Sequence, residues 1–225
     1  MRRLTGVGVG PGDPELCTVK AVRVLREADV VFVPVSSTGE PGYAEGVVRA
    51  YTDRDIRRLA FALGDDPSGR EESWRAAGRA VTAAVRDGAW AAFATIGDPN
   101  LYSTFTYLVR CVPPGVMVDT VPGITALQDL AARSGTVLAE GAQTLALLPF
   151  TAGPRRLTAA LHAYDTVVTY KGGRWMPQLR ALLADAGRLD DAVFGARLGL
   201  DGQVVGPLPD GPAPYLSTVI VRPRS

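Results

Sequence analysis

Short apolar runs alternate with helical stretches along the first half of the chain. Residues 4–9 and 30–33 are apolar and of strand length, while residues 18–28 between them carry apolar side chains at helical spacing with charged residues on the opposite face. A strand, a helix and a second strand in this order predict a right-handed crossover. The two strands are therefore expected to lie parallel in one sheet.

The same alternation continues to about residue 134. Further strands are expected at residues 56–62, 90–95 and 116–121. The intervening and following helices are expected at residues 43–51, 71–87, 102–111 and 125–133. Because periodicity is lost over residues 134–143, we place a domain boundary between residues 134 and 135.

The second half of the chain has a different order of elements. Strands at residues 144–148 and 166–170 are each followed by a helix, at 154–162 and 175–186. Three strand-like runs then follow without a helix between them, at residues 192–197, 203–205 and 215–221. The chain thus predicts two α/β domains, with a mainly parallel sheet in residues 1–134 and a mixed or antiparallel sheet in residues 135–225.

Three turns rich in glycine, proline and aspartate follow strands of the first domain. They are residues 6–16 (GVGVGPGDPEL), 96–104 (IGDPNLYST) and 121–126 (VPGITA). The carboxyl ends of parallel strands share one edge of a sheet, where open α/β sheets bind ligands, so we expect the three turns to line a site. Such residues also serve backbone conformation alone, and a single Gly-Asp-Pro would favour that alternative.

The first turn does not match the common nucleotide-binding motifs. Asp13 stands where a dinucleotide fingerprint requires its third glycine, and the second strand ends at Pro34 with no acidic residue to hold a ribose. The sequence also contains no Gly-Lys-Ser/Thr of a P-loop. Both observations argue against a nicotinamide or nucleoside triphosphate enzyme.

Composition and charge indicate a folded protein without an affinity for nucleic acid. Hydrophobic residues make up 47% of the 225 positions, the formal net charge is +1, and the arginines are scattered. No apolar stretch has the length of a membrane span, and residues 1–4 (MRRL) lead into the first turn without the apolar core of a signal peptide. We therefore expect a cytoplasmic protein.

Metal and nucleophilic chemistry have little support in the sequence. Cys17 and Cys111 form no Cys-x-x-Cys pair, and the single histidine, His162, lies in a predicted helix, where we expect it at or near the surface. A zinc site, a disulfide framework and a Ser/His/Asp triad are thus disfavoured, and we expect no metal. What remains is an enzyme that binds and orients its reactants.

The three turns, in this order, resemble those of the tetrapyrrole methylase family, S-adenosylmethionine-dependent enzymes that methylate ring carbons of sirohaem and cobalamin precursors. The likeness extends to residues 215–218 (YLST). It implies two α/β domains with S-adenosylmethionine as methyl donor in the cleft between them, a tetrapyrrole substrate and a homodimer. Residues 97–105 (GDPNLYSTF) are similar to those of members that methylate carbon 20 of precorrin-2 to give precorrin-3A.

The resemblance also assigns residues to the methyl donor. They are Pro11, Ile96, Gly97, Asp98, Leu101, Thr125, Ala126, Lys171 and Gly199. Lys171 departs from the family pattern, in which Met often follows a Tyr. Each position also has a purely structural reading as a turn residue. As an exposed turn carboxylate, Asp98 is expected to contribute little to packing.

Transfer of a methyl group from a sulfonium is an in-line displacement with a neutral leaving group. We therefore expect proximity and alignment in a water-poor site to supply most of the catalysis. A base can still be needed to take the proton from the methylated carbon, and the candidates are Asp13, Tyr102 and Glu140. The carboxylates of such a substrate suggest three arginines as anchors, Arg49, Arg174 and Arg197, although most surface arginines have no such role.

Alternatives to carbon-20 methylation remain open at this level. The substrate can already carry cobalt, methylation can occur at another ring carbon, or the fold can serve as a noncatalytic nucleoside-binding module. For the homodimer, the helix at residues 71–87 carries an apolar stripe that could pack on its own sheet or on a second copy. The stripe consists of Trp74, Ala77, Val81, Ala84 and Val85.

Overall fold

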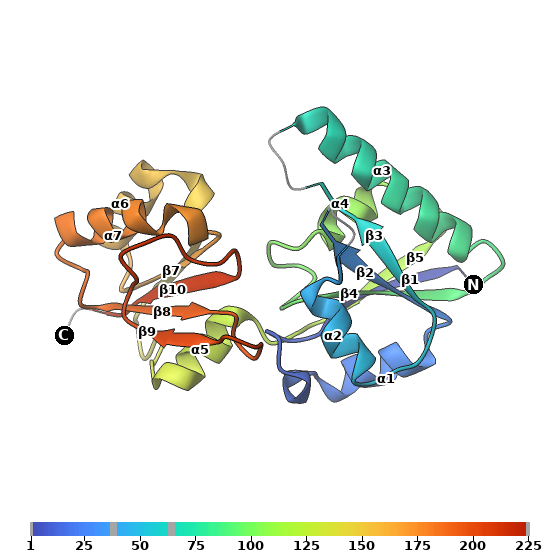
Figure 1. Cartoon of the computed structure of the whole chain (residues 1–225), viewed down its shortest axis with the longest axis horizontal. Helices are drawn as coiled ribbons and strands as arrows, with labels where there is room; N and C mark the ends of the chain where they lie inside the picture. The colour runs from blue at the N-terminus through green and yellow to red at the C-terminus, as the bar shows by residue number, and fades with distance from the viewer. Residues whose placement is uncertain (1, 37–39, 63–65, 224–225) are drawn as a thin grey trace. The chain divides into compact units, whose positions relative to one another are not determined.

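The computed structural model describes residues 2–36, 40–62 and 66–223 (Figure 1). Contacts divide the chain into an N-terminal unit, Met1–Thr125, and a C-terminal unit, Ala126–Ser225. Within the described ranges, no helix combines the length and apolar character that crossing a membrane requires.

The N-terminal unit is built on a five-stranded sheet with the order β3-β2-β4-β1-β5. All four neighbouring pairs are parallel, which confirms the prediction from the alternating pattern. The strands are β1 (Arg3–Gly8), β2 (Val30–Val35), β3 (Ile56–Ala60), β4 (Trp90–Thr95) and β5 (Met117–Val121).

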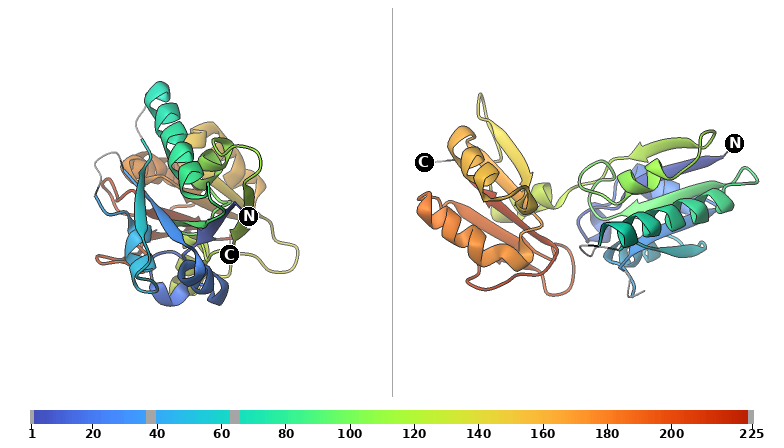
Figure 2. Two further views of the ribbon diagram at one scale, coloured as in Figure 1. Left: turned by 90° about the vertical axis from the view of Figure 1, so that its right-hand side faces the viewer. Right: turned by 90° about the horizontal axis from the view of Figure 1, so that it is seen from above.

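Helices cover both faces of this sheet (Figures 1 and 2). On one face α1 and α2 pack around β-strand residues such as Val7 and Val31. On the other face α3 and α4 pack around Leu4 and Phe93. The helices are α1 (Val19–Glu27), α2 (Tyr43–Arg49), α3 (Pro67–Ala84) and α4 (Phe105–Arg110), and a short 3-10 turn, η1 (Pro14–Leu16), follows the first glycine turn.

Two helices begin at residues other than those expected. α3 starts four residues before the predicted position 71, because the Asp66 carboxylate accepts hydrogen bonds from the backbone N–H groups of Ser68 and Gly69 and caps the helix there. α4 starts at Phe105 and not at Tyr102, because Tyr102 has a φ of 51° and a left-handed residue cannot continue a right-handed helix.

The apolar stripe of α3 packs on its own sheet. Ala77, Val81 and Val85 are buried in the cluster that contains Phe93, and Trp74 and Ala84 pack against the same cluster. Because the stripe is used mainly in the core of its own unit, the prediction of a dimer loses this support.

The C-terminal unit has a mixed sheet with the order β6-β7-β10-β8-β9. The β6–β7 pair is parallel and the other three pairs are antiparallel, as the change of pattern predicted. The strands are β6 (Leu145–Pro149), β7 (Thr166–Tyr170), β8 (Ala192–Ala196), β9 (Val204–Gly206) and β10 (Ser217–Val221). The helices are α5 (Ala126–Ser134), α6 (Pro154–Ala163) and α7 (Met176–Asp185), with 3-10 turns η2 (Phe150–Ala152) and η3 (Gly173–Trp175).

Helix α5 belongs to the C-terminal unit. Leu130 and Ala131 of α5 are buried together with Val168 and Ile220 of the second sheet. At the start of the helix, the Leu127 N–H donates to the Tyr170 hydroxyl at 2.9 Å. The division after Thr125 therefore lies nine residues before the predicted boundary at 134, because an amphipathic helix between two domains can be assigned only by the surface it covers.

A buried carboxylate joins α2 to the edge strand β3. The Glu45 side chain is 3% exposed and accepts hydrogen bonds from Arg49 and Arg58, each at 2.7 Å. The hydrogen bonds from Arg58 lower the pKa of Glu45 to about 2, against the opposing effect of burial, and Arg49 adds to the shift. Arg49, a candidate anchor for substrate, is thus held in a structural ion pair.

This ion pair makes stability depend on pH. Because the pKa of Glu45 falls from its ordinary 4.5 to about 2 on folding, its contribution is complete above about pH 5 and is lost as pH falls toward 2. We expect Glu45→Gln to lower the free energy of unfolding at pH 7 by up to about 3 kcal/mol. Urea unfolding between pH 7 and pH 3 should show a smaller loss of stability for the variant than for the wild type. Equal losses would contradict this role of Glu45.

Candidate functional site

Three glycines bring the carboxyl ends of β1, β4 and β5 into backbone contact. A Cβ atom on Gly8 would lie 2.5 Å from the carbonyl oxygen of Gly97, and one on Gly123 would lie 2.1 Å from the same oxygen. Real Cβ atoms essentially never approach closer than 3.0 Å, so any side chain at either position would push the turns apart. The three turns singled out in the sequence therefore meet at one edge of the sheet, as expected.

Backbone hydrogen bonds continue between the first two turns beyond the ends of their strands. Val9 N–H donates to the Thr95 carbonyl at 3.0 Å and Gly97 N–H donates to the Gly10 carbonyl at 2.8 Å. Gly10 and Gly97 have φ values of +79° and +71°, in the left-handed region that glycine adopts without strain. The glycines thus serve both the close approach and the bend of these turns.

Asp98 connects the second turn to the third. Its carboxylate accepts from the Gly123 N–H at 3.0 Å and from the Asn100 N–H at 2.8 Å. The Asn100 side chain in turn donates to the Thr120 hydroxyl at the end of β5, at 3.2 Å. The expectation that Asp98 is an exposed carboxylate with little packing role is therefore wrong: it is half-buried and satisfies two backbone donors.

The N-terminal unit gathers most of the predicted methyl-donor residues at this edge. Gly97 lies where a Cβ atom would come within 3.9 Å of the Thr125 Cα. Pro11 and Gly97 are buried, and the others are half-buried. The group at this edge consists of Pro11, Ile96, Gly97, Asp98, Leu101 and Thr125.

The remaining predicted residues lie in the C-terminal unit, also at a strand edge. β7 and β8 both run antiparallel to β10, so their carboxyl ends share one edge of that sheet. Lys171 follows β7 and Gly199 follows β8, while Ala126 begins α5, which the Tyr170 hydroxyl holds at the end of β7. The N–H group of Gly199 donates to the Gln203 side chain at 2.8 Å.

The three candidate bases have different surroundings. The Asp13 carboxylate accepts from the Glu15 N–H at 2.9 Å and caps η1, directly after the first glycine turn. Burial raises the pKa of Tyr102 above its ordinary value of 10, so its hydroxyl stays protonated at neutral pH. Glu140 is exposed in the connection from α5 to the amino end of β6, opposite the edge that carries Lys171 and Gly199.

The candidate arginines are also placed differently from one another. The Arg174 guanidinium lies 5.0 Å from the centre of the Trp175 ring, in η3. Arg197 directly follows β8 and is exposed, with its backbone N–H donating to the Leu216 carbonyl at 3.0 Å. Arg197 and Lys171 thus share the same edge of the second sheet, whereas Arg49 is paired with Glu45.

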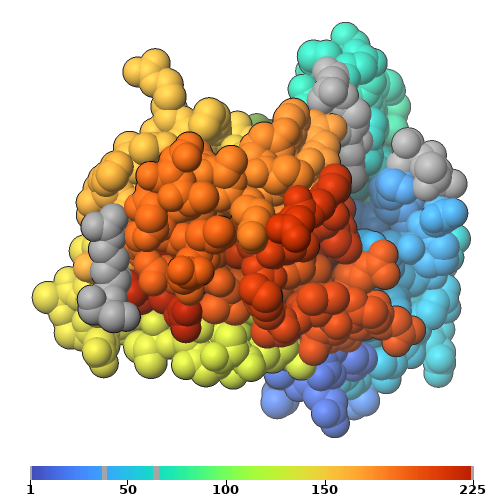
Figure 3. Space-filling view, turned by 60° about the vertical axis from the view of Figure 1, so that its left-hand side comes forward, coloured from blue at the N-terminus to red at the C-terminus, as the bar shows by residue number. Residues whose placement is uncertain are grey.

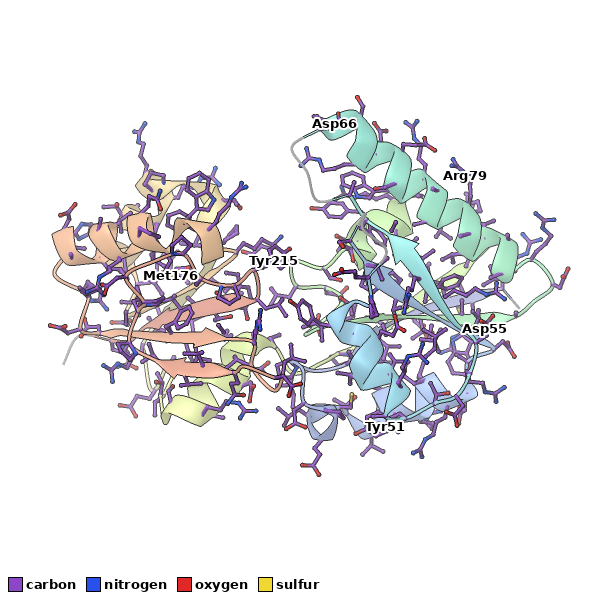
Figure 4. All side chains as sticks on the ribbon, in the orientation of Figure 1. Tyr51, Asp55, Asp66, Arg79, Met176 and Tyr215 are labelled. Atoms are coloured by element: carbon purple, nitrogen blue, oxygen red, sulfur yellow. The ribbon has the colours of Figure 1, made fainter. Side chains whose placement is uncertain are left out.

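A hollow of about 660 Å³ lies elsewhere on the N-terminal unit. Two of its lining residues, Trp74 and Tyr107, have rings that stack with their centres 4.3 Å apart and within 3° of parallel. The lining comes from α3, which Figure 4 marks with Asp66 and Arg79, and from α4. It consists of Pro67, Arg70, Glu71, Trp74, Arg75, Arg79, Tyr107, Arg110 and Cys111, and it includes none of the predicted site residues.

Known proteins resemble the chain over nearly its full length. Residues 3–210 match the family model of tetrapyrrole (corrin/porphyrin) methylases. The chain is 32% identical to cobalt-precorrin-2 C(20)-methyltransferase of Salmonella typhimurium, covering 98% of this chain and 96% of that protein. It is 34% identical to precorrin-2 C(20)-methyltransferase of a Sinorhizobium species, covering 97% and 94%.

The fold is also that of a solved methyltransferase. Uroporphyrin-III C-methyltransferase from Thermus thermophilus, in complex with S-adenosylhomocysteine, superposes with a TM-score of 0.69. The sequences are 24% identical, and the match covers 98% of this chain and 97% of that one. The two-sheet architecture is therefore shared at low sequence identity.

The Asp98 contacts lead to a prediction about stability. We expect Asp98→Ala to lower the free energy of unfolding by about 1–3 kcal/mol, because the N–H groups of half-buried Gly123 and exposed Asn100 lose their acceptor. Asp98→Asn should cost less, since its amide oxygen can still accept one of the two bonds.

Urea unfolding measures both effects. As a control, Asp87→Ala, at an exposed carboxylate just after α3, should change stability by less than about 0.5 kcal/mol. If Asp98→Ala unfolds at the same urea concentration as Asp87→Ala, the carboxylate does not hold the turns together.

Proposed function

Because the chain belongs to the tetrapyrrole (corrin/porphyrin) methylase family, we propose that it transfers a methyl group from S-adenosylmethionine to carbon 20 of precorrin-2, with or without cobalt, in cobalamin biosynthesis. The observation that carries the proposal is the identity of about one third, over nearly the whole length, to two relatives named for this reaction. Methylation of other ring carbons has less support, since both of those relatives are named for methylation at carbon 20.

The glycine turns of the N-terminal unit suit a nucleoside methyl donor. A Cβ atom on Gly97 would meet no heavy atom closer than the Thr125 Cα at 3.9 Å, so the backbone there is open to a ligand, while Gly8 and Gly123 allow the turns to approach each other. The Asp98 oxygens accept one backbone hydrogen bond each, so each keeps a lone pair for a ribose hydroxyl. The proposed contacts are Pro11, Ile96, Gly97, Asp98, Leu101 and Thr125, together with Ala126 and Gly199 of the C-terminal unit.

Lys171 fits this set less well than the resemblance implies. Its side chain is a half-buried cation, and the sulfonium of S-adenosylmethionine is positive too. Placing two positive charges near each other in a site with little water is unfavourable. We therefore assign the Lys171 side chain to a partner of negative charge.

The methyl donor supplies an electrophilic methyl group with a good leaving group. Carbon 20 forms the new C–C bond while the C–S bond breaks and sulfur keeps the electron pair, and the proton of carbon 20 must then leave. The chain's own task is to align the two reactants and to limit water around them. Of the base candidates, Tyr102 stays protonated and Glu140 lies away from the strand edge, so Asp13 is the proposed proton acceptor.

Two further proposals concern the oligomeric state and the cellular compartment, and both rest on the sequence and the resemblance. A second copy of the chain is the proposed partner, because the resemblance implies a homodimer, although the apolar stripe of α3 packs inside the unit. The cytoplasm is the proposed compartment.

The reaction can be tested by incubating the protein with S-adenosylmethionine labelled with ¹³C in its methyl group and with precorrin-2 or its cobalt form. We expect one labelled methyl group per macrocycle, bonded to carbon 20 in the NMR spectrum, and one equivalent of S-adenosylhomocysteine. Label at another carbon would identify a sister reaction. Saturable binding of S-adenosylhomocysteine without transfer to either tetrapyrrole would indicate a noncatalytic nucleoside-binding module.

A further inference from the structure

Two long cationic side chains of the C-terminal unit occupy a costly backbone conformation. Among the described residues, the non-glycine residues with positive φ are Tyr102 at 51°, Lys171 at 61° and Arg197 at 50°. The left-handed region is unfavourable for a residue with a Cβ atom, and such strain persists where the surroundings impose it, often at functional sites. Lys171 and Arg197 directly follow the carboxyl ends of β7 and β8, where α/β folds bind ligands.

Lys171 and Arg197 leave the second sheet at the same edge, on either side of β10. Thr218 of β10 is paired with Tyr170 of β7, and Ser217 is paired with Ala196 of β8. The next residues along β7 and β8 are therefore Lys171 and Arg197, separated by β10 and hence by about 10 Å. The hydrogen bond from the Arg197 N–H to the Leu216 carbonyl holds the backbone of Arg197 beside the segment that enters β10.

The backbone between the two cations is held by specific contacts. The Gly173 carbonyl accepts from the Ala213 N–H at 2.8 Å, and a Cβ atom on Gly173 would lie 2.3 Å from the Pro214 carbonyl oxygen. The turn after β7 is thus packed directly against the segment that enters β10. That segment lies at the molecular surface (Figure 3, red), where Tyr215 is 59% exposed.

The charges at this edge favour a ligand with several carboxylates. Burial lowers the pKa of Lys171, so the half-buried ammonium would gain from a nearby anion. Arg197 is exposed and presents a guanidinium that matches carboxylate geometry. Two long cationic side chains whose backbones lie about 10 Å apart can reach two carboxylates on one rigid molecule, whose second contact is then intramolecular.

We propose that Lys171 and Arg197 bind two carboxylate side chains of the tetrapyrrole, and that the exposed ring of Tyr215 lies against the macrocycle. Tyr215 precedes β10 by two residues (Figure 4). The proposal rests on the proposed function, which supplies the substrate class. It replaces the assignment of the Lys171 side chain to the methyl donor. In this proposal the unfavourable left-handed backbone at both residues serves substrate binding.

The test uses uroporphyrin III, a stable tetrapyrrole with eight carboxylates, in calorimetric titrations of the whole protein. Lys171→Gly and Arg197→Gly remove each cation and also relieve the left-handed strain, whereas Lys171→Ala and Arg197→Ala remove the cation alone. All four variants should bind uroporphyrin III at least about tenfold more weakly than the wild type, a loss typical of a charged hydrogen-bonding partner. Arg155→Ala, at an exposed position in α6, serves as the control and should bind normally.

Stability and methyl-donor binding distinguish this role from a structural one. Each glycine variant should melt about 2–4 °C above its alanine counterpart, because the strain is relieved without any ligand present. All four should bind S-adenosylhomocysteine as the wild type does. Unchanged uroporphyrin affinity would overturn the proposal, as would a selective loss of S-adenosylhomocysteine affinity in the Lys171 variants, which would return Lys171 to the methyl donor. A wild-type protein that binds neither uroporphyrin III nor precorrin-2 would overturn the proposed function itself.

Discussion

The contact among Gly8, Gly97 and Gly123 is the constraint on which the N-terminal site depends. Three parallel strands end side by side only if their turns can pass each other at backbone distance, and a Cβ atom on Gly8 or Gly123 would come within 2.5 Å or less of the Gly97 carbonyl oxygen. Asp98 then fixes the second turn to the third through the Gly123 N–H. The result is an edge made of backbone and small residues, held in place by hydrogen bonds.

The two units offer different chemistry at the carboxyl ends of their strands. The edge of the N-terminal unit combines glycine turns and half-buried apolar side chains with the Asp98 carboxylate, which suits a nucleoside with hydroxyl groups. The edge of the C-terminal unit carries Lys171 and Arg197 in left-handed conformations, which suits carboxylates. This division matches the two reactants of the proposed reaction: a methyl donor built on adenosine and a macrocycle with acidic side chains.

Much of the fold could be predicted from the sequence, because the local periodicity of apolar residues determines where strands and helices form. The order of strands and helices, the parallel first sheet and the mixed second sheet all follow from apolar spacing and from the loss of helices after residue 186. Errors occurred where a single contact decides the outcome. The Asp66 cap moved the start of α3, the left-handed Tyr102 delayed α4, and the surface that α5 covers moved the division between the units.

The site was predictable to the extent that it consists of turns. Glycine and proline mark the turns, so their meeting at one edge could be expected from strand order. The partners of the charged side chains could not be predicted in full, since some are distant in sequence. Glu45 pairs with Arg58 of β3 as well as with nearby Arg49, and Asp98 accepts a hydrogen bond from Gly123. The positive φ of Lys171 and Arg197 could not be predicted from the sequence either, because neither lysine nor arginine favours that conformation.

The most direct measurement of the central claim is a calorimetric titration of S-adenosylhomocysteine into the wild type, Gly123→Ala and Gly46→Ala. Gly46 lies in α2 with nothing within 4 Å of an added Cβ atom, so its variant controls for glycine replacement alone. Circular dichroism would show that each protein is folded. The account predicts one saturable site per chain in the wild type and in Gly46→Ala, and at least about tenfold weaker binding in Gly123→Ala, a loss of about 1.4 kcal/mol or more. Wild-type affinity in folded Gly123→Ala would contradict the claim that the three-glycine contact shapes the site.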